Sequence, residues 1–112
     1  MNTDKQWHDL PFSPEDIAEG QSKGFLLNQQ AYFLVKKHGQ VYGYENSCPH
    51  LKINLEWKPD SFLDFDKSLI QCSSHGALFN IKDGKCVSGP CIGQSLQPLK
   101  LRKLDHSWQA EA

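Results

Sequence analysis

Two short stretches of the sequence each place a cysteine close to a histidine. The first reads Cys48-Pro49-His50, and the second, after residues 51–71, reads Cys72-Ser73-Ser74-His75-Gly76. Two thiolates and two imidazoles together suit a transition-metal site. Structural zinc sites usually separate paired ligands by two to four residues, so that both side chains reach one tetrahedral ion. Only one residue separates Cys48 from His50, which is a shorter spacing than that of most structural zinc sites. The spacing disfavours a zinc site, but zinc remains an alternative.

The ligand pairs resemble those of the Rieske family, in which a [2Fe–2S] cluster has one iron held by two cysteines and the other by two histidines. The resemblance implies that Cys48 and Cys72 hold the inner iron. It implies likewise that His50 and His75 hold the iron nearer to solvent. Three further matches to the family follow the ligands along the chain: His75-Gly76-Ala77-Leu78-Phe79, Asp83-Gly84 and Gly89-Pro90.

This resemblance runs from about Trp7 to Leu104 and sets the expected domain organisation. We expect residues 1–112 to form a single Rieske domain, with the cluster-binding region at about residues 46–91. A chain of this length has room for one modest hydrophobic core and no second catalytic domain.

Residues around the second ligand pair bear on the reduction potential. In high-potential members of the family a disulfide joins the two ligand loops, and the matching positions here are Ile53 and Ser74, so no such bond is expected. Those members also place serine and tyrosine hydroxyls near the cluster sulfurs, where this chain has Ala77 and Phe79. Because hydrogen bonds to the sulfurs stabilise the reduced state, their loss predicts a low-potential cluster of the ferredoxin type.

Composition and charge narrow the class of partner. The formal net charge of −1 argues against nucleic acid, which is bound by strongly basic surfaces. The polar N-terminus lacks the apolar segment of a signal peptide, and no stretch approaches the roughly 20 apolar residues of a membrane helix. We therefore expect a cytoplasmic protein with no membrane partner. In that compartment four cysteines indicate metal binding rather than disulfides.

The secondary-structure signals predict an all-β fold. It would be an antiparallel sandwich or partly open barrel, with the two ligand loops forming a small cluster-binding subdomain at one end. Asp83-Gly84 predicts a two-residue hairpin turn, and Ser13-Pro14 predicts the start of a brief helical turn. The expected strands, with a loose tail from Asp105, are residues 7–10, 24–27, 31–37, 40–44, 69–71, 77–82 and 96–104.

The segment between the ligand pairs, residues 51–71, has two interpretations. Its aromatic residues Trp57, Phe62 and Phe65 either form a satellite hydrophobic cluster that pins the loop, or remain partly exposed as a docking surface beside the cluster. The acidic residues of the same segment either form a solvated face or steer a basic redox partner, and they are Asp60, Asp64 and Asp66.

Two more cysteines lie near the expected covering segment Gly89-Pro90. We expect Cys86 and Cys91 to be buried thiols, with a disulfide between them or a ligand role as the alternatives. Gly89-Pro90 itself is expected to be a rigid cover that limits water near the cluster sulfurs.

The function that these observations favour is electron transfer without substrate chemistry of the chain's own. One cluster in a small domain can pass single electrons, by resemblance from a reductase to an oxygenase-type acceptor. We expect a monomeric, stand-alone Rieske ferredoxin. The alternatives are a small subunit or detached domain of a larger oxidoreductase, nitrite-reductase-like or oxygenase, and a zinc-bound structural domain.

Overall fold

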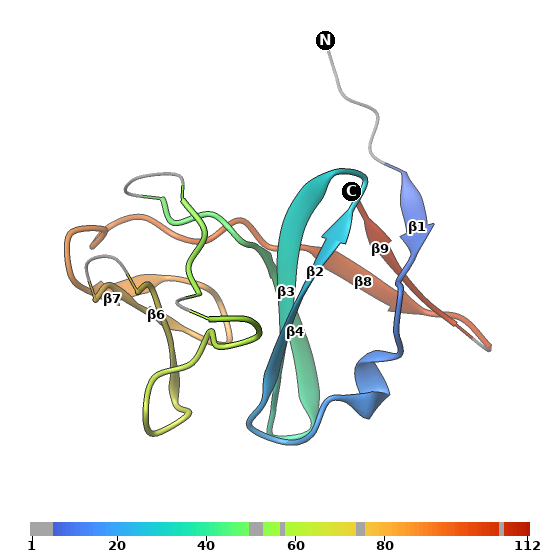
Figure 1. Ribbon diagram of the computed structural model, residues 1–112, viewed down its shortest axis with the longest axis horizontal. Helices are drawn as coiled ribbons and strands as arrows, with labels where there is room; N and C mark the ends of the chain where they lie inside the picture. The colour runs from blue at the N-terminus through green and yellow to red at the C-terminus, as the bar shows by residue number, and fades with distance from the viewer. Residues whose placement is uncertain (1–5, 50–52, 57, 74–75, 106) are drawn as a thin grey trace, which may run out of the picture.

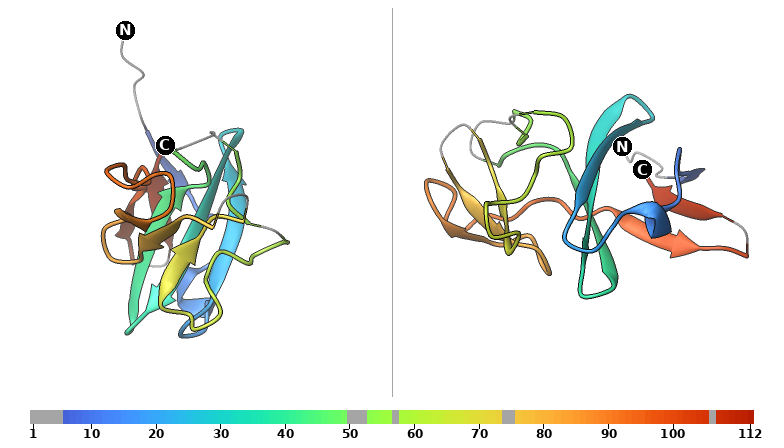
Figure 2. Two further views of the ribbon diagram at one scale, coloured as in Figure 1. Left: turned by 90° about the vertical axis from the view of Figure 1, so that its left-hand side faces the viewer. Right: turned by 60° about the horizontal axis from the view of Figure 1, so that its bottom comes forward.

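The computed structural model describes residues 6–49, 53–56, 58–73, 76–105 and 107–112. Within these ranges the strands form three antiparallel sheets of three strands each, which do not close into one barrel. Figures 1 and 2 show the sheets side by side, with the β2–β3–β4 sheet in the middle. The predicted all-β architecture is confirmed. No helix within the described ranges is long and apolar enough to cross a membrane.

The central sheet contains β2 (Ser22–Leu27), β3 (Gln30–Lys37) and β4 (Gln40–Glu45), joined by two tight hairpins. Both residues of each connecting turn, Asn28-Gln29 and His38-Gly39, have positive φ, as the turn type that matches strand twist requires. The predicted hairpin around His38-Gly39 is confirmed. Its second strand, β4, leads directly toward Cys48.

The central sheet separates two hydrophobic clusters, which explains the unbroken apolar run of β3. Phe33 and Val35 belong to the cluster shared with the ligand-bearing segments, whereas Tyr32 and Leu34 belong to the cluster on the opposite face. Because β3 is the middle strand and is covered on both faces, its side chains are apolar without the usual alternation.

A second sheet has the order β1–β9–β8, from β1 (Trp7–Asp9), β9 (Trp108–Glu111) and β8 (Lys100–Lys103). The prediction of a loose tail from Asp105 is therefore wrong, because β9 is the middle strand and Ala110 is fully buried. β9 pairs with the neighbouring β8 on one side and with β1, about a hundred residues away in the sequence, on the other. The predicted strand 96–104 is also shorter, since residues before Lys100 only bridge to the edge of β4.

The third sheet contains β5 (Leu69–Gln71), β6 (Leu78–Asn80) and β7 (Cys86–Ser88) and carries the second ligand loop between β5 and β6. The predicted two-residue hairpin at Asp83-Gly84 is wrong, because residues 81–85 all lie between β6 and β7. The Asp83 carboxylate accepts a hydrogen bond from the Lys85 amide at 3.0 Å, which stabilises the longer turn and lowers the pKa of Asp83.

The predicted helical turn near the N-terminus is confirmed as a short 3-10 helix, η1 (Pro14–Asp16). The Ser13 hydroxyl accepts a hydrogen bond from the Glu15 amide at 3.3 Å. Glu15 in turn pairs with Lys103 of β8, which lowers the pKa of the Glu15 carboxyl. This contact fixes the N-terminal segment against the β1–β9–β8 sheet.

Candidate metal centre

The two ligand-bearing loops have the same local design. The amide of Cys48 donates to the carbonyl of Ile53 at 2.7 Å, and the amide of Cys72 donates to the carbonyl of Ala77 at 2.8 Å. Each loop thus begins at a cysteine and is closed by a backbone hydrogen bond five residues later. Within the second loop the Gly76 amide also donates to the Cys72 carbonyl, at 3.0 Å. The sequence predicted two short loops that each supply one cysteine and one histidine, and the described ends of the two loops have the same hydrogen-bond pattern.

Cys48 and Cys72 are brought into one hydrophobic cluster, with exposed fractions of 1% and 0%. Burial keeps both sulfurs away from solutes, and a metal ion bound between them would hold them as thiolates. His50 and His75, the other two predicted ligands, lie outside the described residues. The described half of the site therefore fits the two-cysteine iron of a [2Fe–2S] cluster in ligand type and in burial.

A direct backbone contact joins the two loops. The amide of Ser73, next to Cys72, donates to the carbonyl of Leu55 at 2.9 Å. Leu55 follows the first loop and is itself fully buried. This contact fixes the separation of the two ligand-bearing segments, which a cluster shared between them requires.

Asn46 is a supporting residue that the sequence analysis missed. Its side chain is almost completely buried, at 4% exposed. The amide oxygen accepts from the Leu55 amide at 2.7 Å, and the amide nitrogen donates to the Glu56 carboxylate at 2.8 Å. Asn46 thereby bridges the two ends of the first ligand loop. Its only signal in the sequence is an amide side chain two residues before Cys48, at the end of an apolar strand.

The segment around Gly89-Pro90 lies against both ligand-bearing segments, as expected of a cover. Gly89 has a φ of 97°, and a Cβ placed on it would lie 2.8 Å from the Cα of Ala77, so only glycine fits there. Two residues later the Cys91 sulfur lies 3.8 Å from the Cys48 sulfur. The Cys86 thiol instead donates to the Ser88 carbonyl at 3.2 Å. No disulfide joins cysteines in the described part of the chain.

The aromatic residues of the 51–71 segment divide between the two interpretations. Phe62 is fully buried and stacks on Phe33, with ring centroids 4.2 Å apart and planes at 3°, as the pinning interpretation predicted. Phe65 is 96% exposed. This exposure leaves the docking interpretation open for Phe65, and Trp57 lies outside the described residues.

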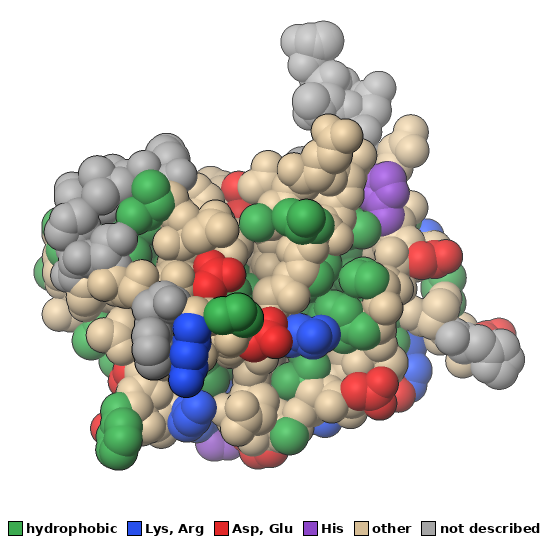
Figure 3. Space-filling view, in the orientation of Figure 1, with side chains coloured by type: hydrophobic (Ala, Val, Ile, Leu, Met, Phe, Trp, Pro, Cys, Tyr) green, Lys and Arg blue, Asp and Glu red, His purple; other side chains and the backbone are tan. Residues whose placement is uncertain are grey.

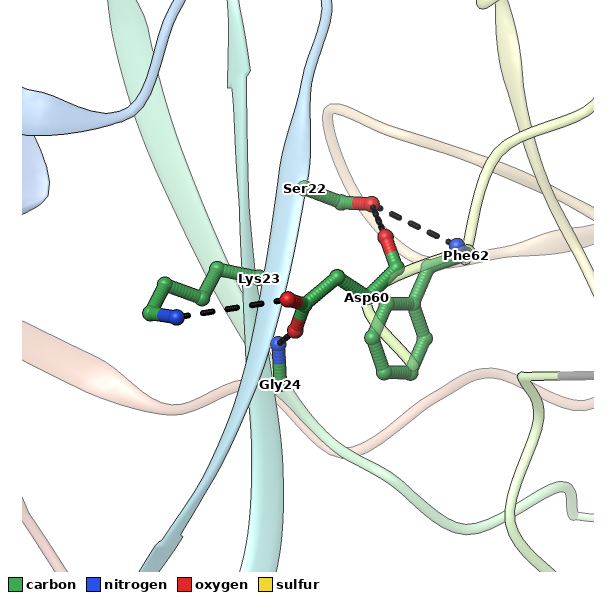
Figure 4. Close-up of polar contacts among 5 residues, drawn as sticks. All are labelled: Ser22, Lys23, Gly24, Asp60 and Phe62. Atoms are coloured by element: carbon green, nitrogen blue, oxygen red, sulfur yellow. Dashed lines mark hydrogen bonds and ion pairs between the residues drawn. The ribbon is translucent and has the colours of Figure 1, made fainter. Parts of the chain in front are cut away.

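Asp60 attaches the same segment to β2 (Figure 4). Its Oδ1 accepts from the Gly24 amide at 2.8 Å, its Oδ2 lies 4.0 Å from the Lys23 ammonium, and its carbonyl accepts from the Ser22 hydroxyl at 2.7 Å. Asp64 similarly accepts from two amides of its own turn, at 2.9 and 3.1 Å. These contacts favour a structural role for both carboxylates over the steering of a partner.

Tyr44 connects the central sheet to the ligand-bearing sheet. Its hydroxyl donates to the Ile81 carbonyl at 2.7 Å inside the core, and burial raises the pKa of the phenol well above its ordinary value. Elsewhere the surface is of mixed charge. On the face in Figure 3, basic and acidic side chains are interspersed, without a single-sign stripe among the coloured residues.

Known proteins resemble this chain in sequence and in fold. Residues 6–104 match the Rieske [2Fe-2S] domain. The chain is 30% identical over 88 residues to the cytochrome b6-f complex iron-sulfur subunit of Chlorobaculum thiosulfatiphilum, covering 79% of this chain and 41% of that subunit. It is 29% identical over 76 residues to the ferredoxin component of the naphthalene 1,2-dioxygenase/salicylate 5-hydroxylase systems of Ralstonia sp, covering 68% of each chain.

Two solved structures share the fold at lower sequence identity. The ferredoxin of carbazole 1,9a-dioxygenase from Nocardioides aromaticivorans IC177 superposes with a TM-score of 0.68 at 18% identity, covering 90% of this chain and 92% of that one. A chain in the reduced complex between oxygenase and ferredoxin in carbazole 1,9a-dioxygenase gives a TM-score of 0.76 at 22% identity, covering 93% of this chain but 27% of that one.

Proposed function

This chain belongs to the Rieske [2Fe–2S] domain family, and we propose that it acts as a ferredoxin that carries single electrons between protein partners. One structural observation carries the proposal. The two cysteines that match the family's ligands are fully buried at the starts of two matched loops, which the Ser73–Leu55 hydrogen bond ties together.

In the proposed mechanism Cys48 and Cys72 would hold one iron of the cluster, and His50 and His75 would hold the other. The [2Fe–2S] cluster, when bound, accepts and donates one electron reversibly. The chain's own residues keep water from the cysteine sulfurs through burial, and hold the loops at a set separation through backbone hydrogen bonds. The histidine edge is the proposed point of electron entry and exit, because the resemblance to the family implies that the histidine-bound iron is the one nearer to solvent.

The proposed partners are a reductase as electron donor and an oxygenase-type protein as acceptor. The relative from Ralstonia sp is the ferredoxin component of dioxygenase systems, and a structural neighbour comes from a complex between oxygenase and ferredoxin. Contacts of this kind bury little surface, below about 1,200 Å², so that the proteins separate again after each transfer.

We also propose a reduction potential near the lower end of the family's range of roughly −150 to +300 mV. Ala77 and Phe79 are fully buried and have no hydroxyl with which to donate to a cluster sulfur. The reduced, more negative state is therefore less stabilised than in relatives with serine and tyrosine at these positions. A midpoint well above zero in a redox titration would contradict this part of the proposal.

The test of the site is spectroscopic and uses protein purified without oxygen. Two irons per chain, with an absorption band that bleaches on dithionite and the EPR signal of a histidine-ligated cluster, are expected. Cys72→Ser and His75→Ala should abolish the signal, whereas His38→Ala, at the exposed β3–β4 turn, should keep it. A colourless protein with one zinc per chain that stays colourless after reconstitution with iron and sulfide would overturn the proposal.

A second candidate function follows from the coverage of the relatives. The chain spans about two fifths of the cytochrome b6-f subunit and about a quarter of the carbazole dioxygenase chain that it matches. Each of those longer chains contains a domain like this one. We therefore propose, as the alternative, a small subunit or a domain of a larger oxidoreductase. Stable co-purification with a large partner favours this alternative, and a monomer that exchanges electrons in brief encounters favours the ferredoxin.

A further inference from the structure

A third buried cysteine lies in contact with the candidate site. The Cys91 sulfur is 3.8 Å from the Cys48 sulfur, and both residues are 1% exposed in the same hydrophobic cluster. A disulfide would bring the sulfurs to about 2.05 Å. The observed separation is instead that of two sulfurs sharing a hydrogen bond.

Metal binding by Cys48 settles which of the two sulfurs donates. A cysteine ligand is a thiolate and has no proton. Cys91 is not among the four ligand positions of the family pattern and keeps its S–H. In the loaded protein only the Cys91 thiol could donate in this contact, and the Cys48 ligand sulfur would be the acceptor.

From this geometry we propose that Cys91 tunes the redox centre by donating a hydrogen bond to the ligand sulfur of Cys48, which raises the reduction potential. The inference rests on the proposed function. Reduction adds one negative charge to the cluster and its ligands, and a donor aimed at a ligand sulfur stabilises that charge. Solvent screens this interaction only a little, because the pair is buried.

The covering segment holds the Cys91 thiol in place. Gly89 packs directly on the backbone of Ala77, and no residue with a Cβ fits at that position. The carbonyl of Cys91 accepts from the Gln94 amide at 2.8 Å, and the Gln94 carbonyl accepts from the Cys86 amide at 2.9 Å. The donor is thus preorganised by the fold, so its hydrogen bond costs no rearrangement when the electron arrives.

This assignment also gives the covering segment a chemical role. Ala77 and Phe79 bring no hydroxyl to the cluster sulfurs. Cys91 supplies a donor from the segment that covers the site. The thiol is a weaker donor than a hydroxyl. The potential is therefore expected to lie above that of the same site without Cys91, yet still in the low range.

The test compares midpoint potentials of the loaded protein and three variants. Cys91→Ala removes the donor, and Cys91→Ser replaces it with a hydroxyl of similar size. Cys86→Ala is the matched control, because Cys86 is an equally buried thiol whose S–H donates to the Ser88 carbonyl. Each protein is checked for two irons and for the EPR signal of the reduced cluster before titration.

Cys91→Ala is expected to lower the equilibrium constant for reduction about threefold, which is about 30 mV at about 59 mV per tenfold change for one electron. Cys91→Ser should restore or exceed the wild-type midpoint, and Cys86→Ala should leave it unchanged. If Cys91→Ala fails to fold, Cys91→Val is a second non-donor that fills the space and should show the same lowering.

Three results would overturn the inference while leaving the proposed function intact. They are equal midpoints for wild type and the non-donor variants, an equal lowering in Cys91→Ser, or an equal lowering in Cys86→Ala. The last two would show that packing, and not the hydrogen bond, sets the value. A wild-type protein that forms no iron–sulfur cluster would instead overturn the proposed function itself.

Discussion

Replacing Asn46 with alanine should loosen the first ligand loop. The substitution removes the acceptor of the Leu55 amide, at 2.7 Å, and the donor to the Glu56 carboxylate, at 2.8 Å. Leu55 is fully buried, so its amide loses its partner without gaining water. A buried unsatisfied amide costs about 1–3 kcal/mol, and the lost bond to Glu56 adds roughly 0.5–1.5 kcal/mol.

The expected total is a loss of about 2–4 kcal/mol in the free energy of unfolding. For a domain near 100 residues each kcal/mol lowers the melting temperature by about 4 °C, so Asn46→Ala should melt about 8–16 °C below wild type. The cluster should also be lost faster, because the Leu55 carbonyl is the acceptor that ties the second loop through Ser73. Both effects are measured without oxygen, by thermal unfolding in circular dichroism and by decay of the visible absorbance with an iron chelator.

Asn46→Asp is the matched control. It keeps an oxygen for the Leu55 amide but places a carboxylate against Glu56, where the wild-type atoms are 2.8 Å apart. Two adjacent carboxylates raise the pKa of one of them in the folded state. Its stability should therefore be greatest at low pH and should fall as pH rises through that raised pKa. The reasoning is refuted if Asn46→Ala melts within about 2 °C of wild type and loses its cluster at the wild-type rate.

Three further predictions concern the elements around the site. Tyr44→Phe should cost about 1–3 kcal/mol because the buried Ile81 carbonyl loses its donor. In the wild-type protein the phenol ionises above about pH 10 only when the chain is unfolded, so the wild type should lose stability there. Tyr44→Phe should not show this loss. Urea midpoints from pH 7 to 11 that fall equally in both proteins would contradict this prediction. Phe62→Ala should lower the free energy of unfolding in urea by about 3–5 kcal/mol, whereas Phe65→Ala, at an exposed position, should change it by less than about 0.5 kcal/mol. Equal effects of the two substitutions would contradict the pinning role of Phe62. Deletion of residues 108–112 removes the middle strand β9, so near-ultraviolet circular dichroism should show lost tertiary packing; an unchanged spectrum and melting temperature would contradict it.

Signals that depend on near neighbours in the chain were sufficient for much of this protein. The spacing of Cys48, His50, Cys72 and His75 predicted the family and its cofactor, because both members of each predicted ligand pair are close neighbours in the sequence. The β3–β4 hairpin followed from strand-forming residues on either side of His38-Gly39. In such cases the residues that set the conformation are those that adopt it, so the local pattern carries the information.

Other features were decided only by the tertiary structure, because their partners are distant in the chain. β9 pairs with its neighbour β8, but it becomes a middle strand only because β1 pairs with it from the far end of the sequence, and its four residues alone carry no signal of that partner. The Asp83-Gly84 pattern is common to short and longer turns, and here the Asp83 contact to Lys85 selects the longer one. Asn46 and Cys91 matter only because folding buries each beside the ligand loops, one against Leu55 and the other against Cys48. The predicted ligands follow from residue type and spacing, whereas the hydrogen bonds around them form only once the sheets have packed.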